Sequence, residues 1–537
     1  MGSLVPEMNR RTLPSTALPE SHGADGRREF SPSWLRGNLL PGGLTCAWLV
    51  MSVGAMFSLS QARALPFMFA IVAFGTAIAW TMVANHGLVV LLGAALALYW
   101  IPVPGYFQTA FFLNTPSIAV PLIIFLAAWC AWGRGLKGAG YLPLTAASWM
   151  FLAAGFVEVA LFGLDPFSWT RLSLAVVFPV LVLYLCTRLT MTSARAWRFT
   201  EVFLWSTTLL CTVFVVGWTM GWIDSGLSAG EGASGRAGGV LTLPLLGLID
   251  FGQAILSSNL SVVLPLGLVA ALVGPKRSRV AGVVLLVAAA LSMALTQGRG
   301  GIVAAVAAVG VLLLILMGQR LIRVRTGVIV GLLLAVVFVS LVVVLTHSVG
   351  TKDPVYRQRY EDPALTLLGT SAGPNVDNGR LANWAFHWAS LRAHPLGVGW
   401  ATTYDVYRPG QQPYPHNLLL LFGSALGFFG VGALLCLLAA VTLLLVRALR
   451  QRRWRREAAF AAAGLASLVA VMVSGITATT GVYDAYGACM VWLTIGLEIL
   501  GSRAIDRSAE SKTAAAAIAP APRSWQWTAN RAGRNSR

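Results

Sequence analysis

Charged residues are scarce in this chain. Asp, Glu, Lys and Arg make up 11% of its 537 residues, whereas 57% are hydrophobic; soluble proteins carry roughly 25% charged residues. Most of the apolar residues fall in runs of about 18 to 25, the length that crosses roughly 30 Å of hydrocarbon. Inside lipid every backbone amide must bond within its own segment, so these runs are expected to be helices. The composition excludes a soluble globular protein and predicts an all-α polytopic membrane protein.

Cysteine is also rare, and an apolar signal sequence is missing at the start. No CxxC spacing occurs, which excludes a disulfide framework or a cysteine metal site. The cysteines all lie in apolar runs, where they are expected to pack as small hydrophobic residues: Cys46, Cys130, Cys186, Cys211, Cys436 and Cys489. No apolar stretch precedes residue 42, so no cleavable signal peptide is predicted. Residues 1–40 and 503–537 are expected to be disordered cytoplasmic tails.

The apolar runs predict about fourteen membrane spans, with twelve as the alternative because the run at 87–103 is short. The predicted spans are 42–60, 65–84, 87–103, 117–133, 142–163, 171–189, 200–222, 250–274, 279–297, 301–318, 326–346, 418–447, 458–477 and 484–501. They divide the chain into a transmembrane bundle (41–346), a periplasmic catalytic loop (347–415) and C-terminal transmembrane helices (416–502) between the two tails.

The net charge of +19 is a topology signal rather than a sign of nucleic-acid binding. With the loops counted alternately from an inside N-terminus, about 29 of the 39 Lys and Arg residues fall on the inner side. This asymmetry predicts an inner-membrane protein with both termini in the cytoplasm, membrane lipids as partners and no nucleic-acid partner.

Three outer connections carry polar residues that the bilayer does not require. The largest is the 347–415 loop, which is rich in proline, glycine and aromatic residues; a loop of this length is usually functional. The second is the 224–239 loop, with Arg236. The third is the tight turn TQGRGG at 296–301, which places Arg299 at the outer membrane boundary.

Within the long loop, residues 377–392 (DNGRLANWAFHWASLR) predict one helix. Asp377 or Asn378 can cap it. Arg380, Trp384, His387, Trp388 and Leu391 recur at helical spacing and form one stripe, whose aromatic rings suit a helix lying flat in the membrane interface. Arg380 in the first turn, beside unbonded amides, would attract an anion; alternatively it pairs with Asp377 or another nearby acid.

His416 lies where the next apolar run begins, in the sequence YPHN at 414–417. Pro415 suits the first helical position, which places His416 in the first turn, where the helix dipole disfavours the imidazolium. A neutral histidine there can act as a general base; the alternative is an interfacial histidine bonded to a backbone carbonyl. His347 and His394 are interpreted as structural.

Three acidic residues lie in or near the predicted spans, and an ionisable group there is a functional candidate. They are Glu158, Asp250 and Glu498. Their spacing in the sequence does not indicate a proton relay.

Four outer motifs follow one another in the chain: GRGG at 298–301, GRLANW at 379–384, HPLGVG at 394–399 and PHN at 415–417. Together with many spans and one large late outer loop, they resemble the O-antigen ligase and O-antigen polymerase superfamily of bacterial envelopes. Fourteen spans would depart from the twelve usual in that family. The specific part of the resemblance covers residues 296–430.

The resemblance implies periplasmic transfer of a glycan from undecaprenyl pyrophosphate to an acceptor hydroxyl, with no metal or other cofactor. Carried over by motif, Arg299 and Arg380 would bind the pyrophosphate and His416 would act at the acceptor. Arg236, Trp384 and Asn417 are added as substrate-binding residues. Because no paired carboxylates indicate a covalent glycosyl intermediate, inversion by a single displacement is expected.

The sequence does not identify the acceptor of the glycan. A ligase would use lipid A–core, a polymerase would use a second lipid-linked glycan, and a protein oligosaccharyltransferase is a third relative. The compact loop and its terminal His–Asn pair favour the ligase. From another class, a lipid-linked glycan flippase would be expected to show internal repeats, and none is visible.

Overall fold

The protein is an all-helical bundle with one small sheet in the part of the chain that the computed structural model describes. The described residues are 141–163, 172–188, 192–220, 223–224, 239–243, 247–251, 253–296, 298–350, 380–400, 415–451, 455–477 and 485–504. The helices are α7 (Leu142–Phe162), η1 (Ser173–Val177), α9 (Phe178–Arg188), α10 (Ser193–Thr219), α11 (Gln253–Val273), α12 (Lys276–Thr296), α13 (Arg299–Gly318), α14 (Val324–Gly350), α16 (Arg380–Ala393), α17 (Leu418–Gln451), α18 (Arg455–Thr477) and α19 (Ala485–Ser502).

Seven of the described helices are long and apolar enough to cross a membrane: α7, α10, α11, α12, α13, α17 and α18. Each predicted span from residue 142 onward overlaps a helix of the structure, and the 171–189 span overlaps two, η1 and α9. The outer surface of the bundle is apolar; α14, for example, exposes Leu332 and Val336. The prediction of an all-α polytopic membrane protein is confirmed. The four predicted spans before residue 140 lie outside the described residues.

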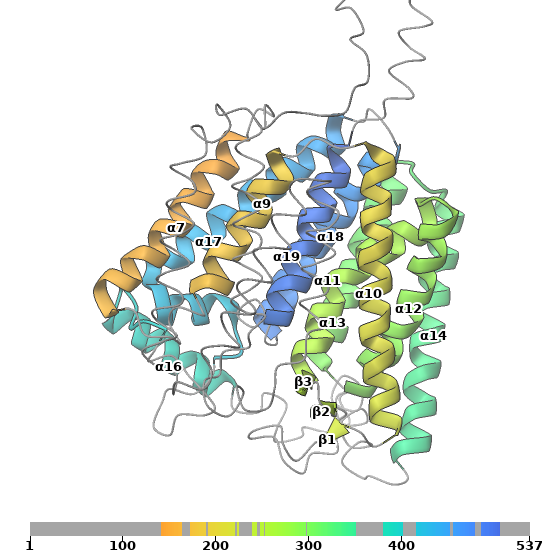
Figure 1. The fold of residues 1–537 in the computed structure, drawn as a ribbon, viewed down its shortest axis with the longest axis horizontal. Helices are drawn as coiled ribbons and strands as arrows, with labels where there is room; N and C mark the ends of the chain where they lie inside the picture. Colours follow the sequence, from red (N-terminus) through yellow and green to blue (C-terminus); the bar gives the residue numbers. More distant parts are fainter. Residues whose placement is uncertain are drawn as a thin grey trace, which may run out of the picture.

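The bundle has two chemically different ends. We call the end that carries α16 and the strands the loop end; Figure 1 shows it at the bottom. Arg299, Arg380 and Arg392 lie there. The helix termini and turns at the opposite end carry many more basic residues: Arg195, Arg198, Lys276, Arg277, Arg279, Arg320, Arg323, Arg325, Arg447, Arg450, Arg456 and Arg503.

A three-stranded antiparallel sheet lies at the loop end, formed by β1 (Ile223–Asp224), β2 (Gly239–Leu243) and β3 (Gly247–Phe251) in that order. The sequence did not predict these strands. Asp250 pairs with Val240 in the β2–β3 ladder. Its placement at the start of a membrane span was therefore wrong, because α11 begins only at Gln253.

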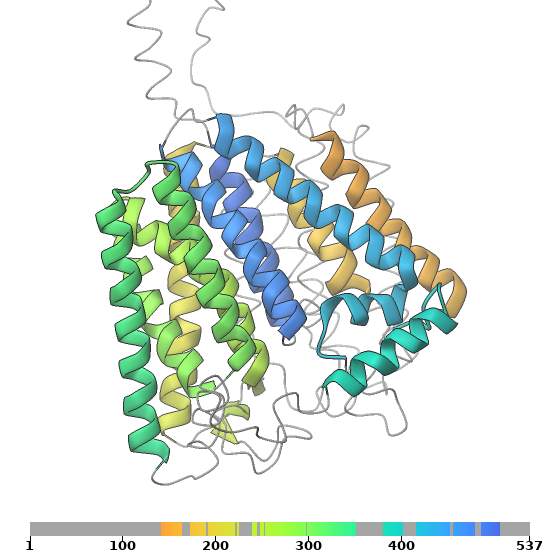
Figure 2. The same cartoon turned by 180° about the vertical axis from the view of Figure 1, so that it is seen from behind.

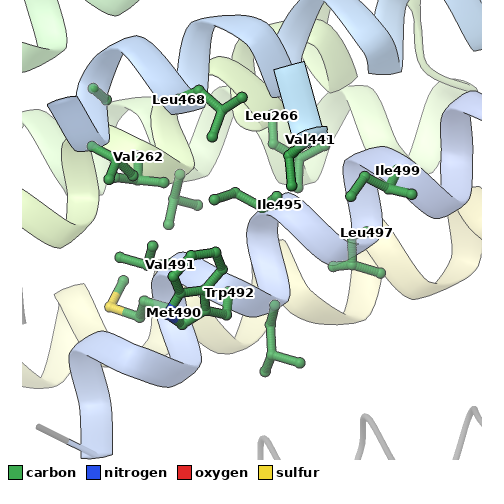
Figure 3. Close-up of a cluster of buried hydrophobic side chains, with 14 of the residues drawn as sticks. Val262, Leu266, Val441, Leu468, Met490, Val491, Trp492, Ile495, Leu497 and Ile499 are labelled. Carbon is green, nitrogen blue, oxygen red and sulfur yellow. The ribbon is translucent and has the colours of Figure 1, made fainter. Parts of the chain in front are cut away.

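One part of the hydrophobic core lies where α11, α17, α18 and α19 meet. Figure 3 shows Val262 and Leu266 of α11 facing Ile495 of α19, with Leu468 and Val441 beside them. Helices also approach closely through glycine: a Cβ on Gly282 of α12 would lie 2.8 Å from the backbone nitrogen of Ala271 in α11. Small residues at such contacts allow membrane helices to pack through their backbones.

Glu498 lies inside this core and is fully buried. The Oγ of Ser467 is 2.8 Å from both the Val262 carbonyl oxygen and Glu498 Oε1. The Ser467 hydroxyl is thus placed to donate to either oxygen. Through Ser467, Glu498 thus links α19, α18 and α11 as part of the packing.

The described cysteines follow the sequence prediction in part. Cys186 and Cys211 are buried as small hydrophobic residues, whereas Cys436 is exposed on α17.

Candidate active site at the loop end

The predicted loop helix exists as α16, which begins at Arg380 and ends at Ala393. The predicted stripe packs on α17, since His387 and Leu391 are buried and His387 Nδ1 lies 2.7 Å from Ser424 Oγ. Figure 2 shows α16 running beside the first segment of α17. The stripe is therefore not exposed along its whole length, although Trp388 remains exposed; that α16 lies flat in the membrane interface stays a prediction. The spacing of the stripe was helical as predicted, but its partner is another helix.

Trp384 ties α16 to the segment that carries His416. Its indole Nε1 donates a 2.8 Å hydrogen bond to the carbonyl oxygen of Pro415. The indole N–H therefore already donates to a protein group. Trp384 would contact substrate through its half-buried ring. Its assignment to substrate binding stays a prediction.

His416 precedes the helix rather than lying in its first turn. The helix α17 begins at Leu418, and Asn417 caps it, its Oδ1 accepting hydrogen bonds from the amides of Leu419 (3.0 Å) and Leu420 (3.1 Å). The placement of Pro415 at the first helical position was wrong, because the Asn417 cap sets the first helical residue at Leu418, three residues later. Because Oδ1 makes the cap, Asn417 would bind substrate through its side-chain amide nitrogen.

The backbone of His416 is in the left-handed region, with φ of 47°. A non-glycine residue is rarely found there, and such conformations cluster at functional sites. Here the neighbours on both sides enforce it: Trp384 fixes the Pro415 carbonyl, and Asn417 is fixed as the helix cap. His416 thus stands half-buried on a short rigid turn at the loop end.

The α17 helix is broken at Gly427, where φ is 67° and ψ is −167°. Such a break leaves backbone groups without helical partners, which is costly at membrane depth. The HPLGVG segment supplies the partners. Val398 N donates to Ser424 O at 2.7 Å, and Phe428 N donates to Pro395 O at 2.9 Å. These bonds therefore hold the HPLGVG segment on the broken helix.

Replacing Gly427 by alanine is expected to destabilise the protein by about 3 kcal/mol or more, because this φ/ψ region is essentially restricted to glycine. A Cβ there would also overlap Pro395 and Leu396. The measurement is the thermal unfolding midpoint of the detergent-solubilised protein. Gly432→Ala on the same helix is the control, since its Cβ would meet no atom within 4 Å. Equal midpoints for the two variants would contradict this account of the break.

Glu158 of α7 anchors the far end of the docked segment. Its Oε1 accepts a 2.9 Å hydrogen bond from the backbone amide of Trp400, and both residues are buried. The Trp400 ring meets Phe422 edge-on at 5.5 Å, and Phe422 stacks on Phe151 of α7 at 5.8 Å. The sequence marked Glu158 as an intramembrane acid but gave no partner for it. The structure assigns it to holding the loop on the bundle.

Arg299 and Arg380 are the first residues of α13 and α16, and both helices begin at the loop end. The helix α18 lies between α13 and the start of α17: it packs along α13, and a Cβ on its Gly475 would lie 3.0 Å from Leu418 Cβ. The starts of α13, α16 and α17 are thus gathered at one end of the bundle. Arg236 lies outside the described residues.

Comparison with known families gives one match. Residues 283–435 match the family model described as O-antigen ligase. This part of the chain, less than half of its length, is similar to the O-antigen ligase family. The matched region includes Arg299, Arg380, Trp384, His416 and Asn417, so the resemblance read from the motifs is confirmed. No curated protein sequence matches the chain.

The family that this region resembles consists of glycosyltransferase-like membrane enzymes of polysaccharide biosynthesis. The matched region ends inside α17 and begins inside α12. Glu158 of α7 and the whole of α11 lie outside it, although Glu158 bonds directly to the docked loop segment.

Proposed function

We propose that this O-antigen ligase homologue transfers a glycan from undecaprenyl pyrophosphate to an acceptor hydroxyl at the periplasmic face, with lipid A–core as the acceptor. The observation that carries the proposal is His416. It stands on a left-handed turn held from both sides, in the matched domain, at the end of the bundle where α13 and α16 begin with arginine.

The donor side of the proposed reaction is assigned to Arg299 and Arg380, with Arg236 as a further pyrophosphate contact. As the glycosidic bond to phosphate breaks, negative charge grows on the leaving pyrophosphate. Guanidinium groups stay protonated and offer forked donors to such oxygens. The first turns of α13 and α16 add unbonded backbone amides and the positive end of the helix dipole.

The acceptor side is assigned to His416. The acceptor oxygen forms a bond to the anomeric carbon while the bond from that carbon to the pyrophosphate oxygen breaks. The proton of the acceptor hydroxyl passes to the His416 imidazole, and undecaprenyl pyrophosphate leaves. One displacement inverts the anomeric configuration, and fixed arginines in place of a divalent cation make the reaction independent of metal. A retained configuration in the product would contradict the single displacement.

The loop end is proposed to face the periplasm, with both termini in the cytoplasm. The distribution of basic side chains supports this orientation, because the opposite end carries most of them and cytoplasmic ends are enriched in Lys and Arg. The proposed donor is a lipid of the inner membrane, so a site at the membrane boundary can receive its pyrophosphate without extracting the lipid tail.

Envelope glycans of a deletion strain separate the ligase from a polymerase. Loss of a ligase makes long glycan chains accumulate on undecaprenyl pyrophosphate, and lipid A–core then carries no such chains. Loss of a polymerase instead leaves lipid A–core capped by single repeat units. We expect the first pattern, restored by a plasmid copy of the wild type. The second pattern would change the acceptor to a lipid-linked glycan.

A further inference from the structure

The turn that carries Arg299 rests on a serine of another helix. Ser257 of α11 is fully buried, and its Oγ donates a 2.9 Å hydrogen bond to the carbonyl oxygen of Gly298. Gly298 is the residue that caps α13, immediately before Arg299. The two helices run side by side, and both begin at the loop end.

The glycines of the GRGG motif fit this contact. A Cβ on Gly301 would overlap Ser257 Oγ and lie 2.7 Å from the Ser257 carbonyl oxygen. Glycine at 301 therefore allows the turn to approach the α11 backbone directly. Gly298 has no side chain, so the N-terminus of α13 has no side-chain cap of its own, and Ser257 supplies a polar contact from the neighbouring helix.

The hydrogen bond fixes the start of α13. The Gly298 carbonyl accepts from Ile302 N at 3.0 Å, the first bond of the helix, and from Ser257 as well. Because the peptide unit is planar, fixing the direction of this carbonyl also fixes the nitrogen and Cα of Arg299. The place from which the Arg299 side chain extends is thus determined by a residue 41 positions earlier in the chain.

We infer that Ser257 is a positioning residue for Arg299, and that through the Gly298 peptide it sets the arginine against the pyrophosphate of the donor. The inference rests on the proposed function of Arg299. It extends the donor site to α11, outside the region that matches the O-antigen ligase family.

The test is a double-mutant cycle between Ser257→Ala and Arg299→Ala in the purified full-length protein. Ser257→Ala is expected to raise the KM for the lipid-linked donor about 10-fold, the loss of roughly one hydrogen bond, with kcat and the acceptor KM changed less than about 2-fold. In the Arg299→Ala background the same substitution is expected to have no further effect, because residues that act as one unit are not additive.

Ser261→Ala is the matched control. Ser261 is buried on the same helix, but its hydroxyl bonds to its own helix at Ser258 O. A purely structural serine would lower the unfolding midpoint and leave the donor KM unchanged, as expected for Ser261→Ala. The inference is overturned if Ser257→Ala matches this control, or if its effect persists undiminished without Arg299. A wild type that transfers nothing would instead overturn the proposed function.

Discussion

Replacing His416 by alanine is expected to lower the rate of glycan transfer by about 10²- to 10⁴-fold, the contribution typical of a general base. The donor should still bind, because its pyrophosphate is assigned to the arginines and not to the imidazole. The measurement is kcat with saturating donor and acceptor, together with the rise in unfolding midpoint that undecaprenyl pyrophosphate produces.

The left-handed backbone of His416 calls for a second variant. Asparagine tolerates this conformation better than most residues but cannot act as the base, so His416→Asn should fold normally and be equally inactive. His394→Ala is the control, since His394 is exposed in the same loop. Full activity of the asparagine variant would show that the imidazole is dispensable and that the histidine is structural.

Arg380→Ala is expected to lower kcat/KM for the donor by about 10²- to 10³-fold, the loss typical when one preorganised donor to a developing negative charge is removed. Arg380→Lys should recover only part of this loss, because an ammonium group cannot make the forked contact. The measurement is the initial rate of transfer at varied donor concentration and fixed acceptor concentration.

Arg392 provides the matched control for Arg380. It is an exposed arginine in the last turn of the same helix, so Arg392→Ala removes an equal charge without touching the first turn. We expect Arg392→Ala to keep the donor KM of the wild type. Equal losses from the two substitutions would mean that the net charge of α16, rather than the placement of Arg380, determines donor use.

The membrane helices and α16 were predictable because their signals are local. An apolar run of fixed length defines a span, and the helical spacing of Trp384, His387 and Leu391 defined α16 to within a few residues at each end. What the stripe packs against was not predictable. A periodic pattern gives one apolar face but does not name its partner, which here includes Ser424 beside His387 and Gly423 beside Leu391 on α17.

The start of α17 was misplaced because two helix-start signals compete in three residues. Proline at 415 and asparagine at 417 both mark helix N-termini. The structure shows Asn417 making the cap, and this moves His416 out of the helix. A closer comparison of the two signals could have favoured the asparagine, because its side chain satisfies free amides whereas proline only removes a donor.

The contacts that hold the site together could not be found from sequence. Glu158 bonds to Trp400 across 242 positions, and Ser257 bonds to Gly298 across 41. Glu158 was noticed only as an intramembrane acid and Ser257 not at all, because the partner of each is set by tertiary packing. The glycines of HPLGVG and GRGG were recognisable as parts of motifs. The structure shows why glycine is needed there: Gly397 lies close to Ala425, and Gly301 lies close to Ser257.

The most direct test of the central claim is transfer by the purified protein from an undecaprenyl-pyrophosphate glycan, in the presence of a chelator. Lipid A–core and a second lipid-linked glycan are offered separately, and His416→Ala serves as the inactive control. We predict transfer to lipid A–core that is lost in the variant. Absence of transfer to either acceptor by folded wild-type protein, or equal transfer by wild type and variant, would contradict the account.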